Sequence, residues 1–451
     1  MTIARVQSTS GSGSGTGLTV AKTLPGAPTA GNLLIAFFNT QGGGESNYVV
    51  NTSSWFYIDR TLTNNGDALI TAIGRYVQSG DTATMPAFLT SGSTFHSWEV
   101  QEISGVSGTW ATDFLSSRAI SRQLSSNTVV TPDHMALVNG SYAICGYAKY
   151  NEGSAGSTPS GWTADINTVN AGNYGSFGIC YKAGMNAGDS AQATWVAAGS
   201  SSNPQGALSI VLTPSQPTDP YVSRIRHYQL GTAQAPTSTM AFGGDPIVGR
   251  LLIGYFHWGD GAGANSDPTF SSNWTKWVSV AGAGSGANCI HGLYRYPQSG
   301  DTRNLPAFAT ASPNNTYSAT NILEIGGVSG SWATDHVSDI SAYRAASTGS
   351  PFSTTAGTSN ANNQLGLCSF GEIGGQTTFP SATGGDGAAY DRGPTLYGGQ
   401  GVAYKALGSS GSSWQTTWTM QAAADKSDYI QSIFGHAPSG AEIRRPFFVA
   451  S

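Results

Sequence analysis

The chain has 451 residues, of which 10% are charged, and its formal net charge at pH 7 is −5. Nucleic-acid binding depends on clustered lysine and arginine, so a nearly neutral chain without a run of three basic residues argues against a nucleic-acid partner. The sequence has no uninterrupted apolar span of ~18 residues, which argues against membrane insertion. The 60 glycines, together with abundant serine and threonine, disfavour helix interiors and predict an all-β fold.

In the first part of the chain, short runs of alternating apolar and polar residues, bounded by Gly, Asn, Asp or Ser clusters, predict strands. A turn at residues 25–28, which contains two prolines, precedes the first strong strand. Continuous apolarity at residues 33–38 predicts a strand that is buried on both faces. The predicted strands cover residues 3–7, 18–24, 33–38, 55–58, 68–76, 93–103, 136–147, 175–182, 192–196 and 206–212.

Two stretches of the first half return in the second half. Residues 75–81 read RYVQSGD and residues 295–301 read RYPQSGD; residues 102–113 read EISGVSGTWATD and residues 324–335 read EIGGVSGSWATD. Ordered matches at a nearly constant separation predict a tandem duplication. Each copy is far longer than the ~20 to 50 residues of solenoid or propeller repeats, so each copy should be a self-standing domain.

The second copy continues the strand pattern of the first. So many short strands in each copy predict a two-sheet antiparallel β-sandwich of jelly-roll type, twice along the chain. In this copy the predicted strands cover residues 221–229, 251–256, 274–280, 289–296, 316–325, 365–370, 401–405, 413–420 and 429–434.

The duplication gives the predicted domain boundaries. Residues 1–213 and 221–437 form the two sandwich copies, and residues 214–220, with three prolines, form a short stiff linker. A tail at residues 438–451 has no counterpart at the end of the first copy. Its two arginines and apolar run suit a segment that docks on a neighbour or back on its own domain. The candidate docking residues are Arg444, Arg445, Phe447 and Phe448.

Several aromatic residues and cysteines occupy equivalent positions in the two copies. A residue that both copies retain is expected to pack the fold, and large rings remove ~150 to 250 Å² each from water. Cys145 and Cys368 lie within apolar strands and are predicted to be buried thiols, whereas Cys180 and Cys289 have no cysteine counterpart. The predicted packing aromatics are Tyr76, Phe88, Trp110 and Trp195, with their counterparts Tyr296, Phe308, Trp332 and Trp418.

Sequence patterns of known catalytic and metal sites are missing. The chain has no G-x-S-x-G, H-E-x-x-H, G-K-[ST] or C-x-x-C motif, so we expect neither enzyme activity nor a metal or other cofactor. Glu102 and Glu324 are the one symmetric acidic pair that we would test for catalysis, and we expect hydrogen-bonded carboxylates at strand ends rather than glycosidase acids. Residues 384–391 only loosely resemble a cation-binding turn and are expected to form a glycine-rich loop.

The two copies differ where the second adds aromatic and polar residues. Exposed rings beside Asp, Asn or His are typical of sugar recognition, because a ring covers the apolar face of a pyranose while polar groups bind its hydroxyls. A surface around these residues therefore predicts glycan contact, and packing at a domain or subunit contact is the alternative. The candidates are His257, Trp258, Asp260 and Trp277, with Tyr390, Arg392 and Tyr397 in a late loop.

The repeated motifs resemble those of tailed-bacteriophage virion structural proteins, a class that includes minor tail proteins, tail fibres and head-decoration proteins with tandem jelly-roll modules. The resemblance rests on GNLLIAF from Gly31, on GRLLIGY from Gly249, on the RYxQSGD turns and on the EIxGVSG strand ends. It extends over both copies. The tail at residues 438–451 also resembles the ends of some minor tail proteins.

The resemblance implies a non-enzymatic minor tail or fibre protein on the virion surface. Such a protein binds other virion proteins, forms a symmetric homo-oligomer such as a trimer, and contacts host-surface polysaccharide. The sequence shows no signal peptide, so synthesis in the host cytoplasm is expected. A head-decoration protein of the same class is one alternative, and a secreted lectin, an adhesin or a polysaccharide depolymerase is another.

Overall fold

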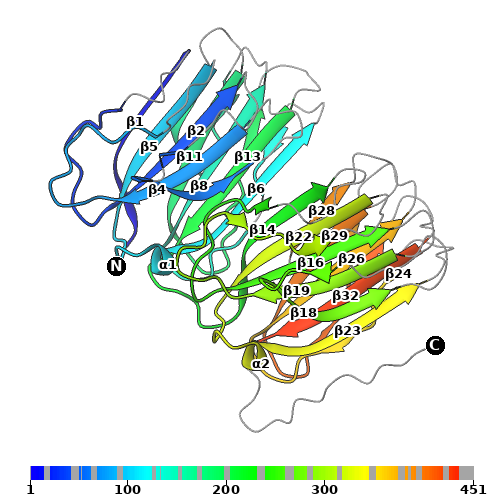
Figure 1. Ribbon diagram of the computed structural model, residues 1–451. Helices are drawn as coiled ribbons and strands as arrows, with labels where there is room; N and C mark the ends of the chain where they lie inside the picture. Colours follow the sequence, from blue (N-terminus) through cyan, green and yellow to red (C-terminus); the bar gives the residue numbers. More distant parts are fainter. Residues whose placement is uncertain are drawn as a thin grey trace. The chain divides into compact units, whose positions relative to one another are not determined.

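The computed structural model divides the chain into two compact units. Unit 1 comprises Met1–Gln216 with Gly243–Asp245, and unit 2 comprises Pro217–Phe242 with Pro246–Ser451. The regular secondary structure described in both units consists almost wholly of antiparallel strands (Figure 1). The residues that the structure describes are 2–14, 21–41, 50–51, 53–61, 69–88, 95–123, 128–132, 134–150, 155–169, 175–197, 204–230, 239–259, 269–281, 288–311, 317–344, 352–373, 381–383, 387–392, 399–419 and 426–435.

Unit 1 contains two large five-stranded sheets, and the short helix α1 (Trp110–Asp113) connects the first sheet to the second. In the first sheet the neighbouring strands are, in order, β1 (Ala4–Ser14), β5 (Phe95–Ser104), β2 (Leu33–Gln41), β4 (Leu69–Tyr76) and β3 (Phe56–Arg60). The second sheet has the order β10 (Thr163–Val169), β11 (Gly175–Met185), β8 (Ser141–Tyr150), β13 (Pro204–Leu212) and β6 (Phe114–Gln123). A small third sheet contains β7 (Thr128–Val130), β12 (Thr194–Ala197) and β9 (Gly156–Ser157).

Unit 2 has the same plan, with α2 (Trp332–Asp335) between its two large sheets. The first has the order β14 (Tyr221–Leu230), β22 (Tyr317–Gly326), β16 (Leu251–Gly259), β19 (Asn288–Arg295) and β18 (Thr275–Ala281). The second has the order β23 (His336–Arg344), β32 (Lys426–Phe434), β26 (Gln364–Ile373), β29 (Gly399–Leu407) and β28 (Gly387–Arg392). Short strands form small sheets beside them: β15 (Met240–Ala241) with β20 (Asn304–Leu305); β17 (Thr269–Phe270) with β21 (Ala309–Ala311); β24 (Phe352–Ser353), β31 (Thr417–Thr419) and β27 (Ser381–Thr383); and β25 (Gly357–Thr358) with β30 (Ser413–Trp414).

All four large sheets share one strand order. When the five strands of a sheet are numbered along the chain, their spatial order is 1-5-2-4-3 in every case. In each sheet the register between the first and fifth strands also shifts near one end, which marks a β-bulge or similar irregularity. The chain completes one sheet before it starts the other, whereas a jelly roll is built from two Greek keys. The all-β sandwich prediction is confirmed, and the shared order fits a tandem duplication.

The two sheets within a unit pack face to face in the same way in both units. In unit 1, β1 packs on β10 and β3 packs on β6; in unit 2, β14 packs on β28 and β18 packs on β23. The first strand of one sheet thus lies over the third strand of the other, as a local two-fold axis would require. In unit 2 the core between the sheets includes Ile253 and Leu323 from one sheet, and Leu367 and Ile430 from the other.

The outer faces of the large sheets carry apolar clusters of their own. Each cluster includes a fully buried ring from the predicted packing aromatics: Phe88, Trp195, Phe308 or Trp418. The prediction that these aromatics pack the fold is confirmed. Short strands and loops cover these outer faces, so side chains on both faces of a central strand such as β2 are buried, as its continuous apolarity predicted.

Candidate functional site

His257 lies on β16 and is fully buried in unit 2. A side chain at Gly371 would collide with its imidazole ring, so the ring packs directly against the neighbouring backbone. Burial disfavours the charged imidazolium and, with a smaller contribution from His291, lowers the pKa of His257 to about 3. The prediction that His257 lies on an exposed glycan-contact surface is therefore wrong. The ring is a neutral core side chain.

The other predicted glycan contacts do not form one described surface. Trp258 is a residue of β16 opposite Cys289 and Ser318, and its side chain lies outside the described residues. Tyr390 and Arg392 belong to strand β28 rather than to the expected loop, so that expectation was wrong for residues 387–392. The remaining candidates, Asp260, Tyr397, Arg444, Arg445, Phe447 and Phe448, lie outside the described residues.

Trp277 is half-buried and packs within an aromatic cluster at the β18 edge of unit 2. Its ring centroid lies 5.1 Å from that of Trp332, which stacks on Tyr294 at 3.8 Å and on His336 at 4.5 Å. The indole Nε1 donates a hydrogen bond to Asp339 Oδ1 at 3.2 Å. Because both faces of Trp332 are stacked, its ring offers no free face to a sugar. The packing interpretation of Trp277 agrees with these contacts.

Asp339 Oδ1 accepts hydrogen bonds from two other strands, from Trp277 Nε1 and from Ser432 Oγ at 2.6 Å. His336 Nε2 lies 3.0 Å from the same oxygen. In a serine hydrolase the histidine stands between the serine and the aspartate. Here the serine binds the aspartate directly, so these three residues are not arranged as a catalytic triad. Asp339 holds β23, β32 and β18 together at the edge of the core.

Two serine–histidine pairs escaped the sequence analysis because no local motif marks them. Ser116 Oγ lies 2.7 Å from His134 Nδ1 in unit 1, and Ser279 Oγ lies 2.7 Å from His291 Nδ1 in unit 2. Both imidazoles are buried, and burial, with the nearby charge of Arg118, holds the pKa of His134 well below its usual range. A nucleophilic pair must reach substrate. These pairs instead satisfy buried polar atoms.

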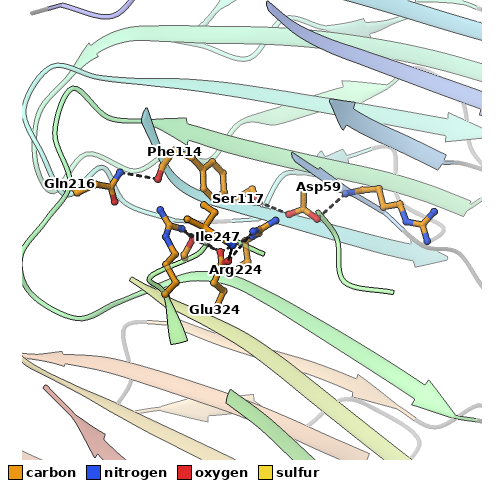
Figure 2. A network of polar contacts seen from close by, with 10 residues as sticks. Asp59, Phe114, Ser117, Gln216, Arg224, Ile247 and Glu324 are labelled. Carbon is orange, nitrogen blue, oxygen red and sulfur yellow. Dashed lines mark hydrogen bonds and ion pairs between the residues drawn. The ribbon is translucent and has the colours of Figure 1, made fainter. Parts of the chain in front are cut away.

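Glu102 and Glu324 hold the turn before the second strand onto the fifth strand of their sheets. Glu102 accepts hydrogen bonds from the Thr29 backbone N–H at 2.8 Å and from Asn32 Nδ2 at 2.6 Å. Glu324 accepts one from the Ile247 backbone N–H at 2.8 Å, as Figure 2 shows. The interpretation of both acids as hydrogen-bonded carboxylates at strand ends is confirmed.

The surroundings of Glu324 are charged, unlike those of Glu102. Arg224 donates to Glu324 from Nε at 2.9 Å and from Nη2 at 3.0 Å (Figure 2). Arg250 Nη1 lies 3.3 Å from Glu324 Oε2. Burial alone would raise the pKa of Glu324, but the two guanidinium charges and these hydrogen bonds outweigh it and hold the pKa below its usual value. Glu324 is therefore the anion of a fully buried ion cluster.

The repeated WATD stretch ends in an aspartate that holds a loop. Asp113 accepts hydrogen bonds from the backbone N–H groups of Ser107 at 2.6 Å and Gly108 at 3.2 Å. Asp335 binds the backbone N–H groups at positions 329 and 330 in the same way, at 2.7 and 3.1 Å. In the RYxQSGD turns, Arg75 pairs with Asp81 and Arg295 pairs with Asp301. Both repeated motifs are thus loop anchors.

A buried acid that the sequence did not single out lies between the sheets of unit 1. Glu99 on β5 is fully buried; its Oε1 accepts a hydrogen bond from Gln101 Nε2 at 3.0 Å, and Tyr142 Oη donates to Gln101 Oε1 at 3.2 Å. Burial raises the pKa of Glu99 to about 8, against smaller opposing effects of Gln101 and Arg5. Glu99 is therefore a neutral carboxylic acid near pH 7.

Comparisons with protein-family models, with curated proteins and with solved structures found no match. Within the described ranges, no three His, Cys, Asp or Glu side chains gather into a group that could hold a metal ion. Nor does the described part of the chain contain a helix long and apolar enough to cross a membrane. The architecture of the two units and the roles of their buried polar residues are the basis for a functional proposal.

Proposed function

We propose that this chain is a non-enzymatic structural protein of a phage virion surface, of the minor-tail or fibre type. One observation carries the non-enzymatic part. The buried carboxylates of the repeated motifs, in both units, are engaged in binding backbone N–H groups of loops. An enzyme keeps such acids free to reach substrate. The carboxylates that accept these backbone hydrogen bonds are Glu102, Asp113, Glu324 and Asp335.

The virion part of the proposal rests on the architecture and the motifs together. In both sandwiches, hydrogen bonds to buried carboxylates hold turns onto the sheets, and in unit 2 a buried ion cluster adds to them; such a fold suits a particle that must stay folded outside a cell. Low charge and abundant Gly, Ser and Thr fit the same role. The repeated strand and turn motifs, from Gly31 and Gly249 onward, resemble those of tailed-phage structural proteins. Fold alone does not assign a function, so the test of this proposal is whether the chain is present in virus particles and where it lies in them.

Assembly is the second part of the proposal. Virion proteins at a tail or on a head surround symmetry axes, so a homo-oligomer that binds other virion proteins follows from this role. Size-exclusion chromatography with light scattering gives the copy number of the purified protein. A strictly monomeric protein over a wide concentration range would argue against the oligomer.

The deciding experiment measures where the chain lies in purified particles and in how many copies. Cryo-EM, or immunogold labelling with quantitative mass spectrometry, gives both. A few copies at the tail support the minor-tail proposal, whereas hundreds of copies over the head support decoration. If purified particles lack the chain, the virion proposal fails. Sugar release from host polysaccharide by the purified protein would contradict the non-enzymatic part and favour a depolymerase.

A further inference from the structure

Two cysteines of unit 1 face each other across neighbouring strands. In the antiparallel pairing of β11 with β8, Cys180 is the direct partner of Cys145. Both side chains are fully buried, and they belong to one apolar cluster with Tyr147 and Trp195. Side chains alternate between the two faces of a sheet, and directly opposed residues project from the same face. The two thiols therefore lie on the same side of the sheet.

The spacing of paired strands suits a covalent bond between these thiols. Directly opposed residues of antiparallel strands have Cα atoms about 4.5 to 5.5 Å apart, and disulfides span about 4.4 to 6.8 Å. In the thiol form, Cys145 donates a hydrogen bond from Sγ to Ala191 O at 3.2 Å and accepts one from Thr131 Oγ1 at 3.6 Å. Sulfur is a weak donor and a weak acceptor, so turning Sγ toward Cys180 costs little.

The second unit lacks this arrangement at the equivalent place. Cys368 on β26 pairs with Ala403 on β29, and Cys289 on β19 pairs with Trp258 and Ala281. Within the described strands, only one pair of cysteines is in direct register. The chain therefore contains its own control, because Cys368 has the same burial and the same strand position as Cys145 but no thiol opposite.

We propose that Cys145 and Cys180 form a cross-strand disulfide when the protein meets a small-molecule disulfide such as oxidised glutathione. One cysteine thiolate attacks a sulfur of the oxidant, forms a mixed disulfide and releases one glutathione thiol. The second cysteine thiolate then attacks the cysteine sulfur of the mixed disulfide and releases the second glutathione thiol. The protein loses two protons and two electrons, and both pass to the oxidant.

Burial controls the rate of this reaction. It raises the pKa of Cys180, with smaller contributions from Cys145 and Glu99, so the closed unit contains very little of the reactive thiolate. In the sheet order, β10 is the edge strand and β11 is its neighbour. Release of β10 exposes β11, so oxidation is expected to accelerate under mildly denaturing conditions. The bond then closes the loop between positions 145 and 180 and stabilises unit 1 by restricting the unfolded chain.

The test maps the cysteines of the full chain after oxidation. The protein is incubated with oxidised glutathione in urea below its unfolding midpoint, free thiols are alkylated, and trypsin is added without reductant. Trypsin cuts after Lys149 and Lys182, so only a disulfide keeps Cys145 and Cys180 in one species. We expect this cross-linked species, a mass lower by two hydrogens, and a higher melting temperature than that of the reduced protein.

Two variants separate this pair from general thiol chemistry. Cys180→Ala, which copies the Ala403 of unit 2, should abolish the cross-link and the gain in melting temperature. Cys368→Ala should change neither. The proposal is overturned if all four thiols of the wild-type protein remain open to alkylation, if only glutathione adducts form, or if the cross-link joins a different pair. Mapping of the wild-type protein gives this answer even where a variant folds poorly.

Discussion

Tyr76 Oη donates a hydrogen bond to Asp113 Oδ2 at 2.6 Å, and Tyr296 makes the same bond with Asp335 at 2.7 Å. Tyr76 ends the fourth strand of the first sheet in unit 1, and Tyr296 directly follows the fourth strand of the first sheet in unit 2. Each aspartate ends the short helix that leads into the second sheet. The bond therefore ties the two sheets of a sandwich together. The tyrosine and aspartate of the two repeated motifs are partners in one contact.

Removing the Tyr76 hydroxyl should loosen this tie. Tyr76→Phe deletes a hydrogen bond to a buried carboxylate, and such bonds contribute about 1.5 to 3 kcal/mol to the free energy of unfolding. The backbone N–H groups of Ser107 and Gly108, which bind the same carboxylate, should exchange faster with deuterium. Hydrogen exchange with mass spectrometry measures this. Tyr296→Phe is the matched control and should affect positions 329 and 330 instead; unchanged exchange in both variants would contradict the tie.

Glu324→Gln should destabilise unit 2 strongly. It leaves the buried charges of Arg224 and Arg250 without their anion, and loss of one partner from a buried ion pair costs about 3 to 5 kcal/mol. Glu102→Gln is the matched control, because the donors at Glu102 are neutral groups of Gln7, Thr29 and Asn32. Urea denaturation should show the larger loss for Glu324→Gln. Equal losses would mean that the arginine charges add nothing.

The lowered pKa of Glu324 also predicts acid sensitivity. A carboxyl whose folded-state pKa is below its unfolded value stabilises the fold above the unfolded value, near 4.5, and this stabilisation is lost as pH falls through the folded pKa. Thermal melts of the wild-type protein should therefore shift to lower temperature as pH drops below about 4.5. A Glu324→Gln variant with the same steep acid dependence would show that other groups cause it.

Glu99 predicts the opposite pH dependence in unit 1. Its folded-state pKa, about 8, exceeds the usual glutamate value of 4.5. Between these two pH values the folded state therefore keeps a proton that the unfolded state has released. Stability should fall as pH rises from about 4.5 to about 8 and then level off. Glu99→Gln keeps an acceptor for Gln101 without a charge, and it should raise the free energy of unfolding at pH 7 by roughly 3 kcal/mol.

The comparison for Glu99 is made at low pH. Near pH 4 the wild-type acid is protonated in both states, so Glu99→Gln and wild type should have nearly equal free energies of unfolding. Unit 2 has the neutral Asn321 at the equivalent position, opposite Tyr255 as Glu99 is opposite Phe37. A variant that gains as much at pH 4 as at pH 7 would point to packing rather than to titration.

A turn residue with positive φ differs in one of the four sheets. Gly31, Gly140 and Gly249 precede the second strand of three sheets with φ of 89°, 83° and 90°, and Asn363 stands there in the fourth with φ of 57°. A residue with a Cβ is strained at positive φ, so Gly31→Ala should lower the free energy of unfolding by about 1 to 2 kcal/mol. This loss is expected although no atom lies within 4 Å of the added Cβ. Asn363→Gly should be neutral or slightly stabilising; urea midpoints that move the other way would contradict this reading.

The parts of the fold that were predictable are those with a strong local pattern. The apolar run at residues 33–38 became β2, and the repeated motifs became turns at equivalent places of the two units. β6 and β23 were missed because both are edge strands with polar residues on both faces, so neither shows a clean period of two. The strand predicted from residue 136 begins only at Ser141, because a turn at Gly140 interrupts the pattern.

The candidate site was less predictable because its residues depend on long-range pairing. His257 stands between Phe256 and Trp258 in the sequence and was expected to lie on an exposed surface, yet strand alternation directs its ring into the core between the sheets. The second copy has no cysteine at the position equivalent to Cys180, so the duplication suggested no partner for it. Its partner is Cys145, which lies 35 positions earlier in the chain and is brought opposite Cys180 by the register of β11 with β8. Likewise, no local signal marks Glu99 as buried. Such contacts become visible only once the strands are paired.

The shared 1-5-2-4-3 order of the four sheets has a consequence for ancestry. A gene a quarter as long would encode every strand pairing that one sheet needs, and two copies of its product, related by a two-fold axis, could close a sandwich as a homodimer. Two rounds of gene fusion would then yield the present chain. In a chain of that origin each quarter is free to change alone, and among the described residues the ion cluster at Glu324, the neutral acid at Glu99 and the thiol pair at Cys145 each occur in one sheet.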